Sequence, residues 1–238
     1  MNQFVHGSDI VVGSGASLDT PETARLIAQN FISFCIRHGV IRFGEFTTKA
    51  GRLSPYFFNA GLFTDGHSLG LLADYYADAI IASGVQFDIL FGPAYKGISL
   101  AAIVSVALAR KDVTVHYAYN RKEVKLHGEG GALVGAPIKG QRVLVIDDVM
   151  SAGTSVRESV ELIREAKAIF AGVVISLDRQ ECGQDSKLSA TQEVEATYNV
   201  PVISIATLSD LVGFLWQQSG YQDHLEAIEA YRAQYGAR

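Results

Sequence analysis

The sequence predicts an α/β fold with a mostly parallel central sheet flanked by helices. Short apolar runs at 88–91, 113–119, 143–146, 170–177 and 202–205 alternate with longer segments of helical periodicity. Strands that are continuous apolar runs are typical of a parallel sheet covered on both faces. Apolar residues make up 48% of the 238 residues, which is enough for a substantial core. In such sheets ligands bind beyond the carboxyl ends of the strands, so the loops that follow these runs are where we expect chemistry.

The first helix is predicted to begin near Pro21. Asp19 or Thr20 can cap it, Pro21 suits its first turn, and Gly39 can end it. Residues 1–18 precede this helix and are rich in Gly and Ser, so we expect a flexible extension. Their Gly13-Ser14-Gly15 stretch is similar to the start of a dinucleotide-binding loop, but no strand, helix or acidic partner completes that motif.

The elements that follow are predicted from the same patterns. Residues 40–63 read as short β segments rich in aromatic side chains. Helices are expected at about 68–83, 98–110, 154–167, 208–218 and 223–234.

Composition excludes several classes of protein. The formal net charge of −5 argues against the broad basic face of a nucleic-acid-binding protein. The N-terminus lacks the pattern of a signal peptide, and the longest apolar run, 98–109, is too short to span a membrane. The two cysteines, Cys35 and Cys182, have no metal-ligand spacing, and Cys35 reads as a buried thiol. We therefore expect a cytoplasmic protein that binds neither membrane nor nucleic acid.

The strongest signal for chemistry follows the apolar run 143–146. Asp147 and Asp148 come first, and small and hydroxyl residues lead from them into a helix: Val149, Met150, Ser151, Ala152, Gly153, Thr154 and Ser155. Backbone N–H groups at a helix N-terminus bind phosphate, and Gly153 lets the backbone approach closely. Two carboxylates beside such a cradle suit sugar hydroxyls and hydrated Mg²⁺. The segment predicts a site for a ribose 5-phosphate, although one of its residues also caps the helix.

At this segment the sequence resembles the type I phosphoribosyltransferases, and within them the orotate phosphoribosyltransferases. Four further segments carry the resemblance: Thr48–Asn59, Phe91–Gly97, Asn120–Gly131 and Leu177–Glu181. The resemblance extends over roughly residues 20–235. It implies a single domain at 19–238, with a small N-terminal subdomain (the hood) at about 19–65 and a core at about 66–238.

The resemblance implies roles for individual residues. Those expected to contact phosphoribosyl pyrophosphate are Lys49, Tyr95, Lys96, Arg121, Lys122, Lys125, His127 and the whole 147–155 segment. Phe57, Phe58 and Ser151 are expected at orotate, and Arg179 at its carboxylate, where a planar guanidinium can form two parallel hydrogen bonds. A surface ion pair between Arg179 and Glu181 is the alternative.

The resemblance also implies a mobile catalytic loop at 120–131. Lys122, Lys125, His127, Asp147 and Asp148 are the expected catalytic residues. Cations in this loop would stabilise departing pyrophosphate, and its glycines would let it close and exclude water. Lys122 is expected to reach the neighbouring subunit of a homodimer with shared sites. Mg²⁺ is the implied cofactor, bound through substrate and water rather than in a protein cage.

Two rival functions stay open at this point. A regulator that senses phosphoribosyl pyrophosphate without catalysis would keep the fold, but the chain has no evident basic face and keeps its lysine-rich loop. A transferase for purine bases is disfavoured by Arg179 and by the 49–59 segment. Ser151 departs from the threonine that many family members have there, and its hydroxyl should preserve the contact.

Overall fold

The computed structural model describes residues 21–48, 50–125, 131–150, 153–183 and 186–237. The expected extension at 1–18 and the capping residues Asp19 and Thr20 lie outside the described residues. So do Lys49, Leu126, His127, Ser151 and Ala152.

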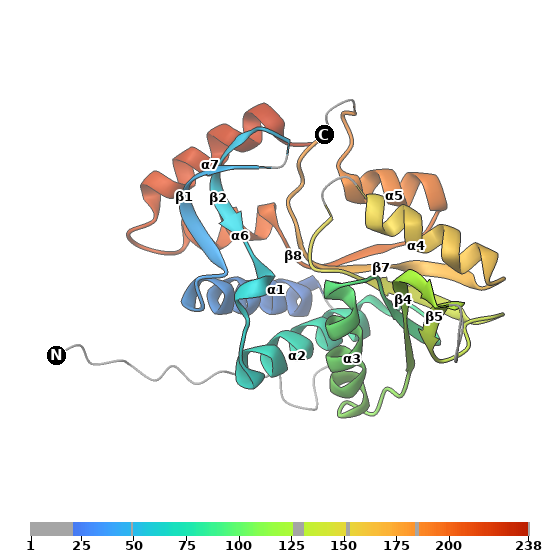
Figure 1. The fold of residues 1–238 in the computed structure, drawn as a ribbon. Helices are drawn as coiled ribbons and strands as arrows, with labels where there is room; N and C mark the ends of the chain where they lie inside the picture. Colours follow the sequence, from blue (N-terminus) through green and yellow to red (C-terminus); the bar gives the residue numbers. More distant parts are fainter. Residues whose placement is uncertain (1–20, 49, 126–130, 151–152, 184–185, 238) are drawn as a thin grey trace.

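Helices and strands alternate along most of the described chain (Figure 1). The α-helices are α1 (Pro21–Arg37), α2 (Gly66–Ser83), α3 (Lys96–Ala109), α4 (Thr154–Glu165), α5 (Ala190–Tyr198), α6 (Leu208–Trp216) and α7 (Gln222–Tyr235). The strands are β1 (Ile41–Thr47), β2 (Leu53–Phe58), β3 (Ile89–Gly92), β4 (His116–Lys125), β5 (Gly131–Gly135), β6 (Arg142–Ile146), β7 (Ile169–Asp178) and β8 (Val202–Thr207). A short 3₁₀ helix spans Ala60–Leu62.

The predicted sheet is confirmed as a six-stranded sheet in the order β5-β4-β3-β6-β7-β8. All neighbouring pairs are parallel except β4 with β5. Alternate side chains of its central strands are buried on opposite faces, as the strand geometry requires. Leu144 and Ile146 of β6 join one core cluster, whereas Val143 and Val145 join the other. The continuous apolar run of β6 therefore contributes side chains to both core clusters.

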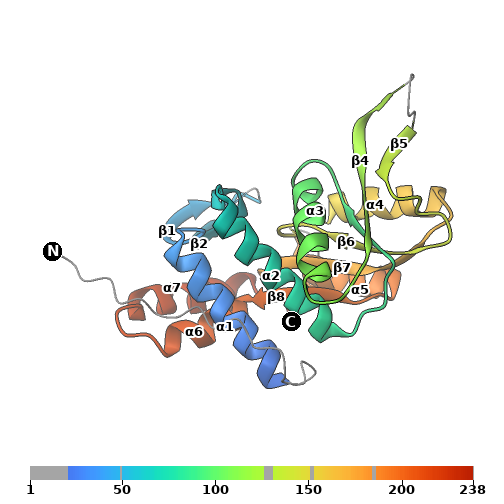
Figure 2. The ribbon, with the colours of Figure 1, turned by 90° about the horizontal axis from the view of Figure 1, so that it is seen from below.

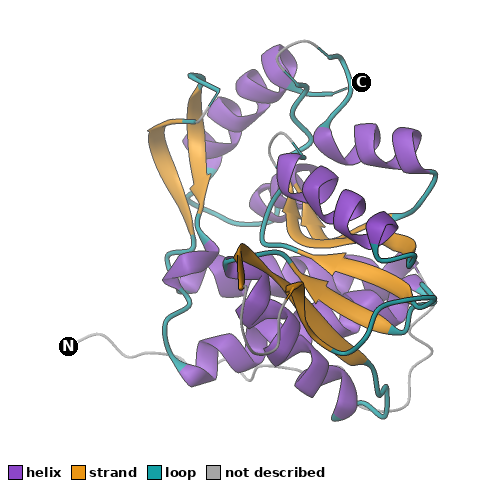
Figure 3. Cartoon of the chain, turned by 45° about the vertical axis from the view of Figure 1, so that its right-hand side comes forward, coloured by secondary structure: helices purple, strands orange, loops and turns teal. Residues whose placement is uncertain are grey.

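Helices cover both faces of this sheet (Figure 3). The larger core cluster contains residues of α1, α2, α3 and α6, and the smaller one contains residues of α4 and α5. Cys35 is fully buried in the larger cluster, as predicted. Among the described residues, no helix has the length and apolarity needed to cross a membrane.

The N-terminal β segments form a separate antiparallel pair, β1 with β2. This hairpin packs against α7, so the last helix of the chain returns to the first strands (Figure 1). Phe43 of β1 stacks on His224 of α7, with ring centroids 4.9 Å apart. The division of the sequence near residue 65 into hood and core stays a prediction, and the hairpin is covered by a helix from the other end of the chain.

The 120–131 segment differs from the predicted loop. β4 begins at His116, later than expected, and continues to Lys125, and β5 then pairs with it in an antiparallel hairpin. Figure 2 shows this hairpin extending away from the helices that cover the sheet. The segment has no apolar run to mark it as strand, and it pairs with β5 irregularly, with a register shift between Asn120 and Lys125. Leu126–Gly130, at its tip, lie outside the described residues.

One predicted helix begins slightly earlier than expected, and another helix was not predicted. α2 begins at Gly66, before the predicted Ser68, because the Asp65 carboxylate accepts hydrogen bonds from the N–H groups of His67 and Ser68. α5 was not predicted, although Ser189 and Gln192 form a capping box that the sequence contains.

Candidate active site

Asp147 and Asp148 follow β6 at the carboxyl edge of the sheet, and each of their carboxylate oxygens has a partner. Asp147 accepts from the Asp148 N–H at 2.9 Å and from the Ser155 hydroxyl at 2.7 Å. Asp148 accepts from the Val149 N–H at 2.9 Å and from the Lys96 ammonium at 2.6 Å. The carboxylates are therefore held in fixed orientations before any ligand arrives.

The environment of the pair disfavours charge on Asp147. Burial raises the pKa of Asp147, and the neighbouring charge of Asp148 acts in the same direction. Hydrogen bonds from Ser155 and from the Asp148 N–H oppose this rise. A partly desolvated carboxylate at a strand end gains from a polar ligand, which is typical of a functional site.

Two buried hydroxyls fix the backbone beneath the pair. Tyr76 of α2 donates to the Asp147 carbonyl oxygen at 2.8 Å, and Ser176 of β7 donates to the Asp148 carbonyl oxygen. Both side chains are fully buried. Sequence analysis missed these residues, since each lies in an apolar run and looks like an ordinary core position.

The helix expected to bind phosphate begins just beyond this pair. Gly153 is the N-cap of α4, with φ of 65°, and Thr154 is the first helical residue. A glycine N-cap has no side chain to occupy the first N–H groups, so a phosphate can use them. Thr154 is exposed, whereas the Met150 side chain is buried and could contribute only its backbone. Ser151 and Ala152 lie outside the described residues.

The loop after β3 brings Lys96 to the same edge of the sheet. A Cβ on Gly92 would lie 1.9 Å from the Gly97 carbonyl oxygen, so these two glycines let the backbone fold closely on itself. The peptide bond between Ala94 and Tyr95 is cis. The Ala94 N–H donates to the Asn120 side chain at 2.8 Å. The Tyr95 side chain is exposed, and that of Lys96 is exposed except for its contact with Asp148.

The basic residues of the β4–β5 hairpin are described only in part. The Lys122 ammonium lies 3.8 Å from Glu158 of α4, and both side chains are exposed. Arg121 lies beside it in β4. Lys125 is the last residue of β4, and nothing is described of its side chain; His127 lies outside the described residues.

Arg179 follows β7 and is largely buried, but it has a partner. Its Nε donates to Glu181 at 2.8 Å and its Nη2 also reaches that oxygen, at 2.5 Å. Nη2 further donates to the Ser54 hydroxyl of β2 at 3.2 Å. The alternative of an Arg179–Glu181 pair is therefore present, although the pair is largely buried and not on the surface.

Phe57 and Phe58 point to opposite sides of β2. Phe58 is buried in the larger core cluster, so only its backbone could contact a ligand. Phe57 is half-buried and stacks on Phe46, with centroids 5.4 Å apart. Of the two rings, Phe57 is the one that a flat base could reach.

Known proteins with similar sequences share most of this chain. Residues 63–204 match the model of the phosphoribosyl transferase domain. The orotate phosphoribosyltransferase of Chromobacterium violaceum is 62% identical over 208 residues, which cover 87% of this chain and 96% of that protein. The chain belongs to the orotate phosphoribosyltransferase family.

Two solved structures are similar to this chain, and the first of them supports the family assignment. The crystal structure of orotate phosphoribosyltransferase from Francisella tularensis is 45% identical, with a TM-score of 0.80, and the match covers 87% of this chain and 98% of that one. The Leishmania donovani UMP synthase structure, 24% identical with a TM-score of 0.69, shares the fold over 87% of this chain and 42% of its own. As a member of the orotate phosphoribosyltransferase family, the protein is an enzyme that transfers a pentosyl group.

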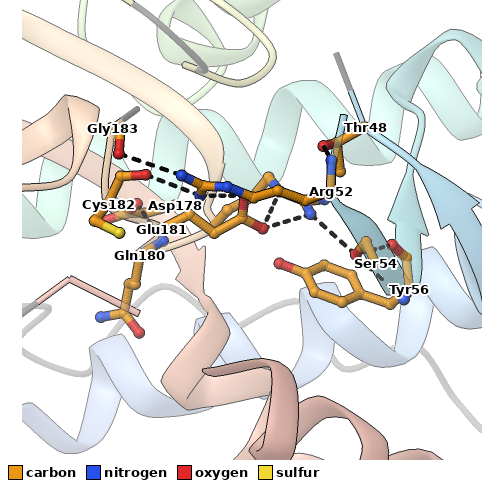
Figure 4. Close-up of polar contacts among 10 residues, drawn as sticks. Thr48, Arg52, Ser54, Tyr56, Asp178, Gln180, Glu181, Cys182 and Gly183 are labelled. Atoms are coloured by element: carbon orange, nitrogen blue, oxygen red, sulfur yellow. Dashed lines mark hydrogen bonds and ion pairs between the residues drawn. The ribbon is translucent and has the colours of Figure 1, made fainter. Parts of the chain in front are cut away.

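Arg52 lies within the Thr48–Asn59 segment, and the sequence suggested no role for it. Arg52 donates to the carbonyl oxygens of Cys182 and Gly183, at 2.9 and 3.2 Å, in the loop that follows Arg179 (Figure 4). Its position three residues after Lys49 gave no signal for this contact, because the partners are 130 residues away in the sequence.

Proposed function

We propose that this enzyme transfers the ribose 5-phosphate of phosphoribosyl pyrophosphate to orotate, which yields orotidine 5'-monophosphate and pyrophosphate in pyrimidine biosynthesis. One observation carries the proposal: an oriented carboxylate pair, Asp147 and Asp148, lies next to a glycine-capped helix N-terminus. The family to which the chain belongs supports the choice of substrates.

Each part of the donor has a suitable group. The N-terminus of α4 binds the 5-phosphate, and its dipole adds to the N–H donors. Asp147 and Asp148 accept hydrogen bonds from the ribose hydroxyls. Lys96 and Tyr95 lie on the adjacent loop, where they bind the pyrophosphate, and Lys49 contributes from the hood.

On the acceptor side, Arg179 binds the orotate carboxylate, and Phe57 lies against the ring. Ser151 and the Phe58 backbone complete this side. An orotate nitrogen attacks the anomeric carbon as the bond to pyrophosphate breaks, and the ribose gains oxocarbenium character. Arg121, Lys122, Lys125 and His127 stabilise the charge of the leaving group, while the ordered site positions the reactants.

Mg²⁺ fits this site only when it is bound through substrate and water. All four carboxylate oxygens of Asp147 and Asp148 already accept hydrogen bonds, and the described residues contain no cluster of three or more side chains able to hold a metal. Bound in this way, the ion would neutralise pyrophosphate and ribose oxygens. We further propose a cytoplasmic homodimer in which Lys122 serves the partner's site.

An absorbance assay tests the reaction. Orotate absorbance should fall only when phosphoribosyl pyrophosphate and Mg²⁺ are present, and uracil or purine bases in place of orotate should not react. Binding of phosphoribosyl pyrophosphate without any turnover would favour the rival regulator, and turnover of a purine base would favour the other rival.

A further inference from the structure

Arg179, Glu181 and Arg52 form a row of alternating charges. Glu181 lies between the two arginines: its Oε1 accepts from Arg179, and its Oε2 is 4.0 Å from Nη1 of Arg52. The side chains are 14–16% exposed, so solvent screens the three charges only weakly. Formal charges of +1, −1 and +1 leave the row with a net charge of +1.

Two of the three guanidinium nitrogens of Arg179 donate to neighbouring side chains. Glu181 occupies the edge formed by Nε and Nη2, and Ser54 accepts from Nη2. Nη1 takes part in none of these three hydrogen bonds. Burial raises the pKa of the Tyr231 phenol, and Arg179 lies close enough to that phenol to oppose the rise. Packing of the guanidinium over the Tyr56 ring, 4.4 Å from its centroid, restricts the remaining motion. Glu181, Ser54 and Tyr56 therefore fix the orientation of the Arg179 guanidinium.

Arg52, just before β2, contacts both the loop that follows Arg179 and the helix α7. Its guanidinium donates to the two carbonyl oxygens that follow Glu181 and lies 4.8 Å from the centroid of the Tyr235 ring of α7. Figure 4 shows Arg52 extending from the hairpin toward Cys182 and Gly183. A single side chain thus joins three segments that are far apart in the sequence.

We infer that Arg52 and Glu181 are positioning residues for the acceptor substrate: Glu181 orients Arg179, and Arg52 offsets the charge of Glu181 so that one positive charge remains for the substrate carboxylate. Without Arg52, Arg179 and Glu181 would form a neutral pair with little attraction for an anion. This inference rests on the proposed binding of orotate by Arg179.

Steady-state kinetics of charge variants test the inference. Arg52→Gln should raise the KM for orotate about tenfold and change the KM for phosphoribosyl pyrophosphate less than about twofold, since only a charge-assisted contact weakens. Adding Glu181→Gln to Arg52→Gln should recover most of the orotate affinity, because the positive charge of Arg179 is then no longer cancelled. A purely structural role for Arg52 predicts no such recovery.

The orienting role of Glu181 has its own pair of variants. Glu181→Gln keeps an oxygen that accepts from Arg179, so the KM for orotate should not rise. Glu181→Ala removes that acceptor, so the KM should rise several-fold. The matched control is Arg164→Gln, which removes another arginine that stacks on a tyrosine, Tyr198, and should change neither KM.

Three results would overturn the inference: equal changes in both KM values for Arg52→Gln, no recovery in the double variant, or equal KM values for Glu181→Ala and Glu181→Gln. If Arg52→Gln does not fold, the comparison of Glu181→Ala with Glu181→Gln still tests the inference. Calorimetric binding of orotate to the same variants separates this inference from the proposed function. A wild-type protein that binds orotate without converting it would contradict the function alone, and one that does not bind orotate would contradict both.

Discussion

The ammonium nitrogen of Lys96 lies 2.6 Å from Oδ2 of Asp148, so a proposed pyrophosphate ligand is paired with a proposed ribose ligand before substrate binds. The lysine is largely exposed and its partner is buried. Because Lys96 is already in contact with water, it can move from Asp148 to the pyrophosphate at little cost. Asp148 is buried, so the ribose hydroxyls must then supply the hydrogen bond that Lys96 gave.

Lys96→Ala should raise the KM for phosphoribosyl pyrophosphate about tenfold, because it removes a charge-assisted contact to the leaving group. The KM for orotate should change less than about twofold. Lys111→Ala is the control, since it breaks a 2.8 Å ion pair with Asp78 away from the proposed site. A similar rise in KM for the Lys111 variant would contradict the assignment.

Asp147→Asn should abolish most turnover without loss of stability. Since burial raises the pKa of Asp147, its ionised form at neutral pH opposes folding; a neutral amide removes this cost and keeps one acceptor oxygen, for Ser155 or for the Asp148 N–H. We expect the melting temperature at pH 7, measured with a metal chelator present, to stay constant or to rise by roughly 2 °C. Near-normal activity would contradict a role for this carboxylate in binding ribose.

The Lys122 prediction tests the shared site of the proposed dimer. Lys122→Ala and Arg179→Ala chains should each form an inactive homodimer. In a mixed dimer, the site on the Lys122→Ala chain keeps its own Arg179 and borrows Lys122 from the partner. Equal mixing makes about half of the dimers mixed, with one working site in each, so activity should return to about a quarter of wild type.

This test depends on exchange of subunits. The two chains should therefore be co-expressed with different tags and the doubly tagged dimer purified. If Lys122 serves its own chain, the doubly tagged dimer will have no complete site and will remain inactive.

Asp88→Asn should reduce stability at neutral pH but not at strongly acid pH. Hydrogen bonds from the Arg142 side chain, followed by the one from its N–H, lower the pKa of Asp88 to about 2. A lowered pKa in the folded state contributes stability that is present above the ordinary value, 3.8, and is lost as the pH falls through about 2. Urea unfolding of wild type and variant between pH 2 and 5 should give midpoints that converge as the pH falls. Midpoints separated by a constant amount would show that this pair does not titrate as described.

The sequence by itself determined the parallel sheet and the position of the 147–155 segment at the end of β6. The predicted runs at 88–91 and 143–146 are apolar at nearly every position, and only a sheet covered on both faces can bury them. Asp147, Asp148 and Gly153 are close in sequence, so their chemistry could be interpreted from spacing alone. The positions of Lys96 and Arg179 in strand-end loops then predicted the edge of the sheet on which they lie, and the family resemblance implied their roles.

Only the tertiary structure decided which partners these residues have. The contacts of Arg52 with Cys182, of Tyr76 with Asp147 and of Arg179 with Ser54 each join residues more than 70 positions apart, and no local pattern encodes them. Strand geometry points Phe57 and Phe58 in opposite directions, but which of the two is buried depends on the face of β2 that the core covers. Propensity and periodicity report the conformation of a segment, whereas burial and pairing depend on what the rest of the chain packs against it.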